Sequence, residues 1–424
     1  MNKIDVVKNK NFILLMIGSF ASLVGSGIQS FALSLYILKI TGSVTQFATV
    51  LTIGIIPRLI FSTIGGVFAD WFDRKKIIVY LDIARGIIIC GLLAINMTGQ
   101  LGLVHIYVSV ILLSTISAFF SPAIATVIPT VVDREELMQA NSINSLLSGT
   151  GQLIAPIIGG LLLSFSSLSV IFVINALSFL LSGIMECFIK IPRINKKTKY
   201  NLKEFGKSFK EGLEFTFQNR LLSILIVCCF MVNLSLYSIF SVGLTFILKV
   251  FLSVSDMHYG VFESIVVSGS IMGPLIAIKM LKGRKLEKIY SKSLLIITLL
   301  MSLMTFIVSP IVTINTFTVY LVLCFIGFLV SLIVGLVNIS MNTIFQKQIP
   351  NDYLGRVSSV VGMLTALSVP IGQMMFGYMF EYLNVYIPVF VAMSLVCFAK
   401  ILFDLSNGKN LAHEHRETQL NKQE

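Results

Sequence analysis

Residues 65–76 read GGVFADWFDRKK, and in this stretch a long apolar run ends in a dense group of charged residues. The small residues Gly65, Gly66 and Ala69 would let the end of a helix approach a neighbouring helix closely. Asp70 could then meet the positive N-terminus of that neighbour, while the basic residues that follow stay in cytoplasmic water. The spacing predicts either a gate hinge between helices or an ordinary positive-inside loop.

The composition of the chain favours a membrane protein before any further motif is considered. Of the 424 residues, 56% are hydrophobic and 12% are charged, and the mean hydropathy is +0.91. Soluble globular proteins have an apolar share of about 45–50%. The six cysteines and four histidines show no metal-ligand spacing, and there is no phosphate-binding loop or Ser/His/Asp pattern. The sequence therefore predicts no enzyme, no cofactor and no metal site.

Apolar runs long enough to cross a bilayer recur along the whole chain. A hydrocarbon core of about 30 Å needs roughly 20 apolar residues in a helix. We therefore expect an all-α polytopic membrane protein with twelve transmembrane helices in two six-helix bundles. The expected spans are 12–40, 44–69, 77–97, 102–128, 139–165 and 167–190, followed by 220–250, 257–281, 291–309, 315–346, 356–383 and 385–406.

The basic residues predict the orientation of these helices. The chain has 32 Lys and Arg against 20 Asp and Glu, and most of the basic residues fall in connections that the expected topology places on one side. Because cytoplasmic loops are enriched in Lys and Arg, we expect a protein of the cell membrane with both termini in the cytoplasm. The same bias accounts for the net charge of +12 without any contact to nucleic acid.

A polar connector divides the chain into two parts of similar length. We expect one bundle at 1–190 and another at 220–406, with a cytoplasmic linker at 191–219 and a polar cytoplasmic tail at 407–424. Apolar residues recur at helical spacing among lysines in the linker, a pattern typical of an amphipathic helix on the anionic inner leaflet.

The two parts of the chain also show a weak internal repeat. Residues 137–160 align with 354–377, with identities that include Gly160 and Gly377. Each stretch is a polar loop that leads into a helix containing Gly and Pro. This pattern is typical of two parallel repeats whose interface holds the binding site near the middle of the membrane.

A second motif lies in the fifth expected helix, where residues 151–160 read GQLIAPIIGG. Pro156 removes one backbone donor and can kink the helix. Gly151, Ala155 and Gly159 recur every four residues, so they line one face and permit a close helix contact. Such a face can rock against its neighbour, or it can be a tightly packed helix pair with no role in coupling.

The two motifs together resemble the major facilitator superfamily. The first is similar to that family's loop between helices 2 and 3, with Asp73 where many members have Gly. The second is similar to the helix 5 motif of the antiporter members, with Ala155 where Gly is usual. The resemblance implies the major facilitator fold and a contact of Asp70 with the start of the eleventh helix, near residues 356–359. It also implies gating roles for the matching residues, which are Gly66, Asp70, Arg74, Lys76, Gly151, Pro156, Gly159 and Gly160.

Two further stretches are similar to a narrower branch of the family. Residues 128–142 (IPTVVDREELMQANS) and 259–273 (YGVFESIVVSGSIMG) resemble bacterial drug and macrolide exporters and their siderophore-exporting relatives. The resemblance implies a secondary exporter that moves an amphipathic drug-like compound out by proton antiport and alternating access. Export of a siderophore or endogenous metabolite stays open and, from another class, so does a transporter-like sensor or lipid flippase. The expected partners are a small-molecule substrate, protons and the lipid bilayer, with the chain as a monomer.

A few ionisable residues lie within the apolar runs. Charge at the bilayer centre costs at least about 2.5–3.5 kcal/mol, so such residues usually have a function. The candidates for proton coupling are Glu263, Arg58 and Asp82. Glu263 could instead reach the outer interface or form a structural hydrogen bond. Asp82 is one helical turn from Arg85, and Glu186 has the same relation to Lys190, so both acids are also expected to pair locally.

The central cavity of the family is lined by helices 1, 4, 7 and 10. In this sequence those helices supply aromatic and amide side chains without net charge, which suit a bulky amphipathic or weakly cationic molecule better than a phosphate or sugar acid. Each of them could equally be a packing residue. The candidates for substrate contact are Gln29, Phe119, Phe120, Asn233, Tyr237, Phe240, Asn338 and Asn342.

Overall fold

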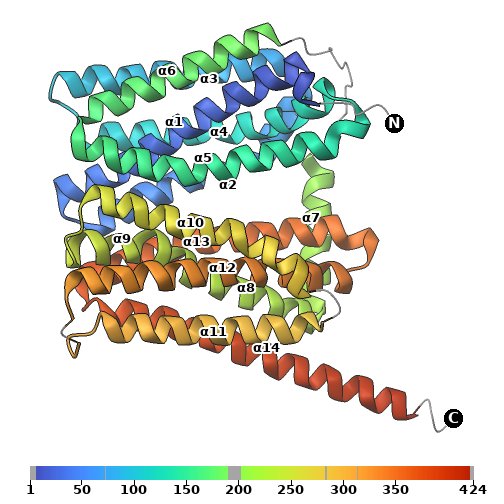
Figure 1. The fold of residues 1–424 in the computed structure, drawn as a ribbon. Coiled ribbons are helices and arrows are strands. Elements are labelled where there is room, and N and C mark those ends of the chain that lie inside the picture. Colours follow the sequence, from blue (N-terminus) through green and yellow to red (C-terminus); the bar gives the residue numbers. More distant parts are fainter. Residues whose placement is uncertain (1–5, 72, 190–201, 282–283, 313, 421–424) are drawn as a thin grey trace. The chain divides into compact units, whose positions relative to one another are not determined.

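The structure is a computed structural model of the chain and describes residues 6–71, 73–189, 202–281, 284–312 and 314–420 (Figure 1). Side chains are described for these residues except 7, 62–71, 125–126, 134, 138, 202–209, 221, 278–279, 281, 351–352, 354–355 and 407–420. The chain forms two compact units, and each is treated by itself below.

The first unit contains six long helices and the beginning of a seventh. The six are α1 (Lys10–Thr41), α2 (Val44–Trp71), α3 (Arg74–Met97), α4 (Leu103–Val131), α5 (Leu137–Phe165) and α6 (Leu168–Phe188). Residues 254–264, which include the first turns of α10 (Asp256–Leu281), also pack within this unit.

The second unit contains the remaining helices (Figure 1). They are α7 (Leu202–Gln218), α8 (Arg220–Ser238), η3 (Ile239–Gly243), α9 (Leu244–Phe246), η4 (Ile247–Phe251), the rest of α10, α11 (Leu286–Ile307), α12 (Thr316–Gln348), α13 (Asn351–Tyr382) and α14 (Tyr386–Leu420). Short 3-10 helices, η1 (Val6–Lys8) and η2 (Arg134–Glu136), precede α1 and α5 in the first unit.

The internal packing of the two units follows one scheme. In the first unit α1 packs on α5 and α6, and α3 packs on α4 and α6. In the second unit α8 packs on α13 and α14, and α11 packs on α12 and α14. The α2–α4 pair of the first unit has its counterpart where Gly273 of α10 meets Gly335 of α12. Equivalent pairs in both units are what the weak internal repeat in the sequence predicted.

The prediction of twelve membrane-spanning helices is confirmed. The described residues contain twelve helices that are long and apolar enough to cross a membrane, and their bounds agree closely with the expected spans. Large apolar side chains such as Ile60, Phe165 and Leu275 lie exposed on these helices. Exposure of apolar side chains suits helices whose solvent is lipid, because backbone polar groups are already satisfied within each helix.

The start of α3 differs from the expected start at residue 77, and Asp73 is the reason. Its side chain accepts hydrogen bonds from the backbone nitrogens of Lys75 and Lys76, at 3.1 and 3.3 Å. A carboxylate N-cap satisfies donors that the first turn leaves free, and it begins the helix at Arg74. The residue that departs from the family motif therefore has a local structural function.

The span expected at 220–250 is continuous, but its second half is not regular α-helix. Two π-helical segments, η3 and η4, flank the short α9. Gly243 lies against the ring of Phe380, and a Cβ atom at this position would be 2.8 Å from that ring. Widened turns of this kind occur often at functional sites, and the hydropathy pattern does not reveal them.

The polar tail is more helical than the sequence indicated, and the helix expected in the linker is present but also docks on protein. The last helix continues from the membrane span to Leu420, through most of the segment expected to be a polar tail. In the linker, α7 is helical and docks on α13: Glu211 pairs with Arg356 at 2.8 Å, and Phe215 stacks on Tyr353 at 4.5 Å between ring centroids. The described half of α7 therefore packs against α13 through Glu211 and Phe215.

Candidate functional site

Charged side chains are buried together in the first unit, on α3 and α6. Asp82 and Glu186 are fully buried, and Arg85 is 7% exposed. Nη1 of Arg85 donates to Oδ1 of Asp82 at 2.9 Å, which confirms the local pairing predicted from their spacing. These three residues and Ser182 of α6 are called the charge cluster below. Burial of charge is costly unless the charges are paired, so the ion pair is essential to this cluster.

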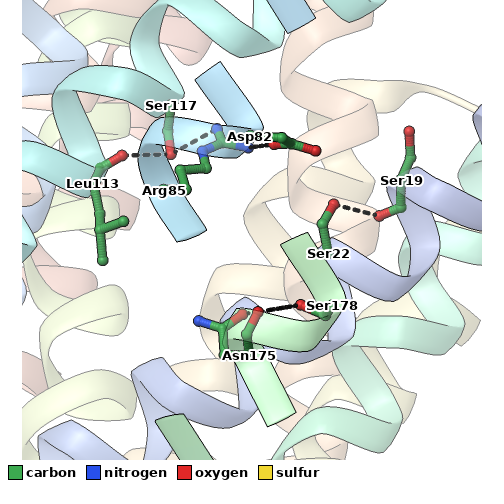
Figure 2. Close-up of polar contacts among 8 residues, drawn as sticks. All are labelled: Ser19, Ser22, Asp82, Arg85, Leu113, Ser117, Asn175 and Ser178. Carbon is green, nitrogen blue, oxygen red and sulfur yellow. Dashed lines mark hydrogen bonds and ion pairs between the residues drawn. The ribbon is translucent and has the colours of Figure 1, made fainter. Parts of the chain in front are cut away.

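Arg85 connects the charge cluster to α4. Its Nη2 donates to Oγ of Ser117 at 3.2 Å, and the Ser117 hydroxyl donates in turn to the carbonyl of Leu113 at 2.8 Å (Figure 2). The guanidinium carbon lies 4.0 Å from the ring centroid of Phe120 and 5.6 Å from that of Phe179. Such cation–π contacts stabilise a guanidinium that has left water. The sequence of α4 has no Asp, Glu, Lys or Arg, and Arg85 brings a positive charge against this helix.

The side chain of Glu186 makes no hydrogen bond to the described residues. Both of its carboxylate oxygens are buried without a partner, and so are Oδ2 of Asp82 and the hydroxyl of Ser182. Asp82 and Arg85 act on Glu186 electrostatically. Its expected partner, Lys190, lies outside the described residues. Sequence reasoning treated Glu186 as half of a local pair, although an acid within an apolar run was itself the signal of a functional candidate.

Gln29 is held by a buried hydrogen bond between α1 and α6. Nδ2 of Asn175 donates to Oε1 of Gln29 at 2.6 Å, and the two side chains are only 1% and 3% exposed. Oδ1 of Asn175 accepts a further hydrogen bond from Ser178 at 3.1 Å (Figure 2). This geometry supports the packing alternative for Gln29. The sequence could not reveal the pair, since the two residues are 146 positions apart.

We expect the substitution Asn175→Leu to destabilise the protein by about 1–3 kcal/mol, because it leaves the Gln29 amide buried without a partner. The double variant Gln29→Leu with Asn175→Leu should lose less stability than the sum of the single changes, as two coupled residues do. Thermal unfolding of the detergent-purified protein measures both effects, with Asn342→Leu on the exposed face of α12 as the control. Additive losses would contradict the pairing.

The other cavity candidates differ in their surroundings. On α4, Phe120 is buried against Arg85, and Phe119 lies 6.0 Å from Phe61 between ring centroids. In the second unit, the side chain of Asn233 donates to the carbonyl of Cys229 at 3.0 Å, one turn earlier in its own helix. Phe240 is partly buried within η3, and three candidates are exposed on the second unit: Tyr237, Asn338 and Asn342. Contact of these residues with substrate stays a prediction.

The remaining candidates for proton coupling, Glu263 and Arg58, are not members of the charge cluster. The carboxylate of Glu263 accepts a hydrogen bond from the Tyr259 hydroxyl at 2.7 Å, and the Tyr259 ring stacks on Phe31 at 5.3 Å. Glu263 therefore has the structural hydrogen bond that was its alternative explanation. Arg58 is exposed on α2, and it acts electrostatically on Arg85.

The motif at 151–160 packs against both α1 and the start of α10. A Cβ atom at Gly159 would be 2.9 Å from the Phe31 ring, and one at Gly160 would be 2.6 Å from the carbonyl oxygen of Asp256. The carbonyl of Pro156 lies against Gly260 in the same way. The small residues thus permit the close helix approach that their spacing predicted.

The motif at 65–76 is only partly described. Gly66 and Asp70 belong to the end of α2, and their side chains lie outside the described residues. Arg74 and Lys76 lie in the first turn of α3, which Asp73 caps. Lys75 Nζ donates to the carbonyl of Cys187 at 2.6 Å, so the beginning of α3 is tied to the end of α6 beside Glu186. The gating role of this motif stays a prediction.

Twelve helices that can span a membrane, in two similarly packed units with charges buried inside one of them, define a polytopic membrane protein. A family model described as Major Facilitator Superfamily matches residues 15–373. The chain belongs to this family, and the resemblance drawn from the two motifs is confirmed.

Similar proteins support the drug-efflux branch of the family. Macrolide efflux protein A of Streptococcus pyogenes is 26% identical over 372 residues, which cover 85% of this chain and 87% of that protein. Enterobactin exporter EntS of Salmonella choleraesuis is 32% identical over 157 residues, which cover 36% and 37% of the two chains. These relatives are transporters, and nothing in them points to catalytic activity.

Solved structures agree with this fold. A bacterial homologue of the iron transporter ferroportin in the inward-facing state aligns with a TM-score of 0.74 at 16% identity, covering 93% of this chain and 97% of that one. The nucleoside transporter NupG aligns with a TM-score of 0.72 at 14% identity, covering 93% and 98%. At these identities the likeness shows the fold alone.

Proposed function

We propose that this protein is a secondary exporter of amphipathic drug-like compounds, macrolides among them, driven by proton antiport. The observation that carries the proposal is the likeness to macrolide efflux protein A along 85% of the chain. A compound of this kind is bulky and largely apolar with few charges. It suits candidate walls made of aromatic rings and amides, such as Phe119, Tyr237 and Asn338.

The coupling to protons rests on a second observation. The first unit buries two carboxylates, Asp82 and Glu186, against one guanidinium, Arg85. Ionisable groups inside membrane-spanning segments are costly, and in transporters they commonly carry protons or contact ions. The energy source of the proposed exporter is therefore the proton gradient.

The proposed cycle is alternating access by two six-helix bundles, at 1–190 and 220–406. The linker at 191–219 and the tail at 407–424 are placed in the cytoplasm, together with both termini, because of the distribution of Lys and Arg. Asp70 and the glycines of the 151–160 motif are proposed as gating residues. We propose that the monomer in the cell membrane is the working unit.

The test is drug resistance in bacterial cells that lack their own efflux pumps. Cells expressing the protein should accumulate less radiolabelled erythromycin than control cells, and a protonophore should abolish the difference. Unchanged accumulation of a panel of macrolides and other amphipathic compounds would overturn the drug-export proposal. Export that persists with the protonophore would overturn the proton coupling.

One observation favours a second candidate, export of a siderophore or another endogenous metabolite. The identity to enterobactin exporter EntS, 32%, exceeds that to macrolide efflux protein A, although it covers only 36% of this chain. Secretion of a siderophore by cells expressing the protein, with no change in macrolide accumulation, would select this candidate. A sensor should show no proton-dependent flux at all, and a flippase should move labelled phospholipid between leaflets of a vesicle.

A further inference from the structure

We propose that Glu186 is the proton-carrying residue of this exporter and that Arg85 transmits its protonation state to α4. The inference rests on the proposed function, because it names the residue that would couple the substrate to the proton gradient. Glu186 was not among the candidates for proton coupling that the sequence supplied. The assignment of this role to Glu186 rests on the residues that surround its side chain in the fold.

Glu186 lies beside a pair of opposite charges. Asp82 and Arg85 form an ion pair and compensate each other. Glu186 is then an additional carboxylate with no exposure to solvent and, among the described residues, no hydrogen-bond partner on either oxygen. A buried carboxylate without partners carries the full cost of desolvation, which one bound proton removes. The empty hydrogen-bonding sites of this side chain therefore favour a reversible proton site over a structural ion pair.

The helices packed on α6 bring few titratable groups to Glu186. From α3 they are Asp82 and Arg85, and Nζ of Lys75 on the same helix donates to the carbonyl of Cys187, the residue after Glu186. Two other elements pack on α6, and neither α1 between Lys10 and Tyr36 nor α5 has a titratable side chain. Arg58 of α2 acts on Arg85 and is exposed. On α1, α3, α5 and α6 the other acid is Asp82, which is already held in the ion pair with Arg85.

The carboxylate of Glu186 can bind and release one proton. A proton from water adds to one carboxylate oxygen of Glu186 and gives a neutral carboxylic acid, which has an O–H to donate. Acceptors that lack partners are present in the charge cluster, at Oδ2 of Asp82 and Oγ of Ser182. When the proton leaves to water, the carboxylate returns and competes with Asp82 for the guanidinium of Arg85.

The competition of Glu186 and Asp82 for Arg85 affects the α4 residues that are proposed to contact substrate. Arg85 holds Ser117 by a hydrogen bond of 3.2 Å and lies 4.0 Å from the ring centroid of Phe120, both on α4. Phe119 and Phe120 are candidates for substrate contact. A shift of Arg85 toward Glu186 weakens its contacts to Asp82, Ser117 and Phe120 together. Loss of the proton therefore changes the α4 surface that is proposed to bind substrate, which gives the reciprocal coupling that antiport needs.

The test uses the full-length purified protein with Glu186→Gln, which keeps the shape of the side chain and removes the titration. Infrared difference spectra taken across a pH series should show the carbonyl band of a protonated carboxylic acid in the unaltered protein, and Glu186→Gln should lose it. Glu186→Asp, which keeps a carboxyl group, should retain a band. The control is Glu214→Gln on α7, where the carboxylate is 58% exposed. A band that persists in Glu186→Gln overturns the inference, as does a band that sodium removes at constant pH.

Transport in proteoliposomes provides the second readout. With an imposed pH gradient, accumulation of labelled erythromycin should fall about tenfold in Glu186→Gln, within the range of about 5–150-fold typical of coupling between two ligands. Exchange of erythromycin without a gradient should persist. If Glu263→Gln loses gradient-driven accumulation and Glu186→Gln keeps it, the role belongs to Glu263 and the inference is wrong. If the unaltered protein accumulates no erythromycin, the proposed function fails while the infrared result still decides the inference.

Discussion

Replacing Arg85 with Met will destabilise the protein by about 3–5 kcal/mol, the usual cost of removing one partner from a buried ion pair. Asp82 would stay fully buried without the guanidinium that lies 2.9 Å away, and would be left either with an unpaired charge or with a bound proton. Glu186 would lose the guanidinium that acts on it electrostatically. The substitution also removes the contacts to Ser117 and Phe120 that join α3 to α4. The loss should appear as a lowered unfolding temperature of the purified protein.

The matched control for this prediction is Lys400→Met in α14. It breaks another pair on one helix, between Lys400 and Asp404 at 2.9 Å, but those side chains are 25% and 39% exposed. Exposed pairs contribute about 0–1 kcal/mol, so the control should change stability little. A second comparison is the double variant Arg85→Met with Asp82→Asn, which should recover part of the loss because it removes the unpaired charge. Equal effects of Arg85→Met and Lys400→Met would contradict the buried pair.

Replacing Gly160 with Val should have the second largest effect, on both stability and export. A Cβ atom at this position would be 2.6 Å from the carbonyl oxygen of Asp256 and 3.4 Å from Cα of Gly260. Both are backbone atoms, so α5 and the first turns of α10 would have to move apart. Overpacking of this kind typically costs about 1–3 kcal/mol. The separation would also strain the hydrogen bond of 2.7 Å from Ser264 to the carbonyl of Leu153.

The control for this prediction is Gly183→Ala in α6. A Cβ atom at Gly183 has no heavy atom within 4 Å, so the added methyl group meets no obstacle. Replacing a glycine inside a helix by alanine stabilises by roughly 0.5–1 kcal/mol when there is room. Gly160→Val and Gly183→Ala should therefore shift the unfolding temperature in opposite directions. Erythromycin accumulation in pump-deficient cells should rise for Gly160→Val alone, and normal export in this variant would remove the 151–160 motif from the proposed gate.

The most local features of the fold could be predicted from the sequence. A helix that crosses a membrane satisfies its own backbone and needs only length and apolar side chains, so each span could be identified without knowing its neighbours. Deviations occurred where one side chain decided the boundary. Asp73 caps α3 and begins it at Arg74 instead of residue 77. The π-helical segments of the seventh span also escaped prediction, because hydropathy does not distinguish them from α-helix.

The candidate site was predicted less completely, and the reason is the distance along the chain between its members. The Asp82–Arg85 pair was found because both residues lie one turn apart on the same helix. Glu186 and Asp82 lie on different helices, and Gln29 and Asn175 are 146 positions apart. No periodicity links such residues. A single sequence offers only the sign that each is polar within an apolar run.

The sequence by itself determined that the chain spans a membrane with twelve helices, where its two motifs lie and which family it resembles. The hydropathy of a span, the spacing of its small residues and the charges at its ends are properties of one helix or one connection. The order of residues is therefore enough to reveal them. Only the tertiary structure showed that Glu186 is buried beside the Asp82–Arg85 ion pair, in which the two charges already compensate each other. It also showed that Arg85 joins this pair to α4. Desolvation and hydrogen bonding depend on which helices pack together, and that is a property of the folded unit.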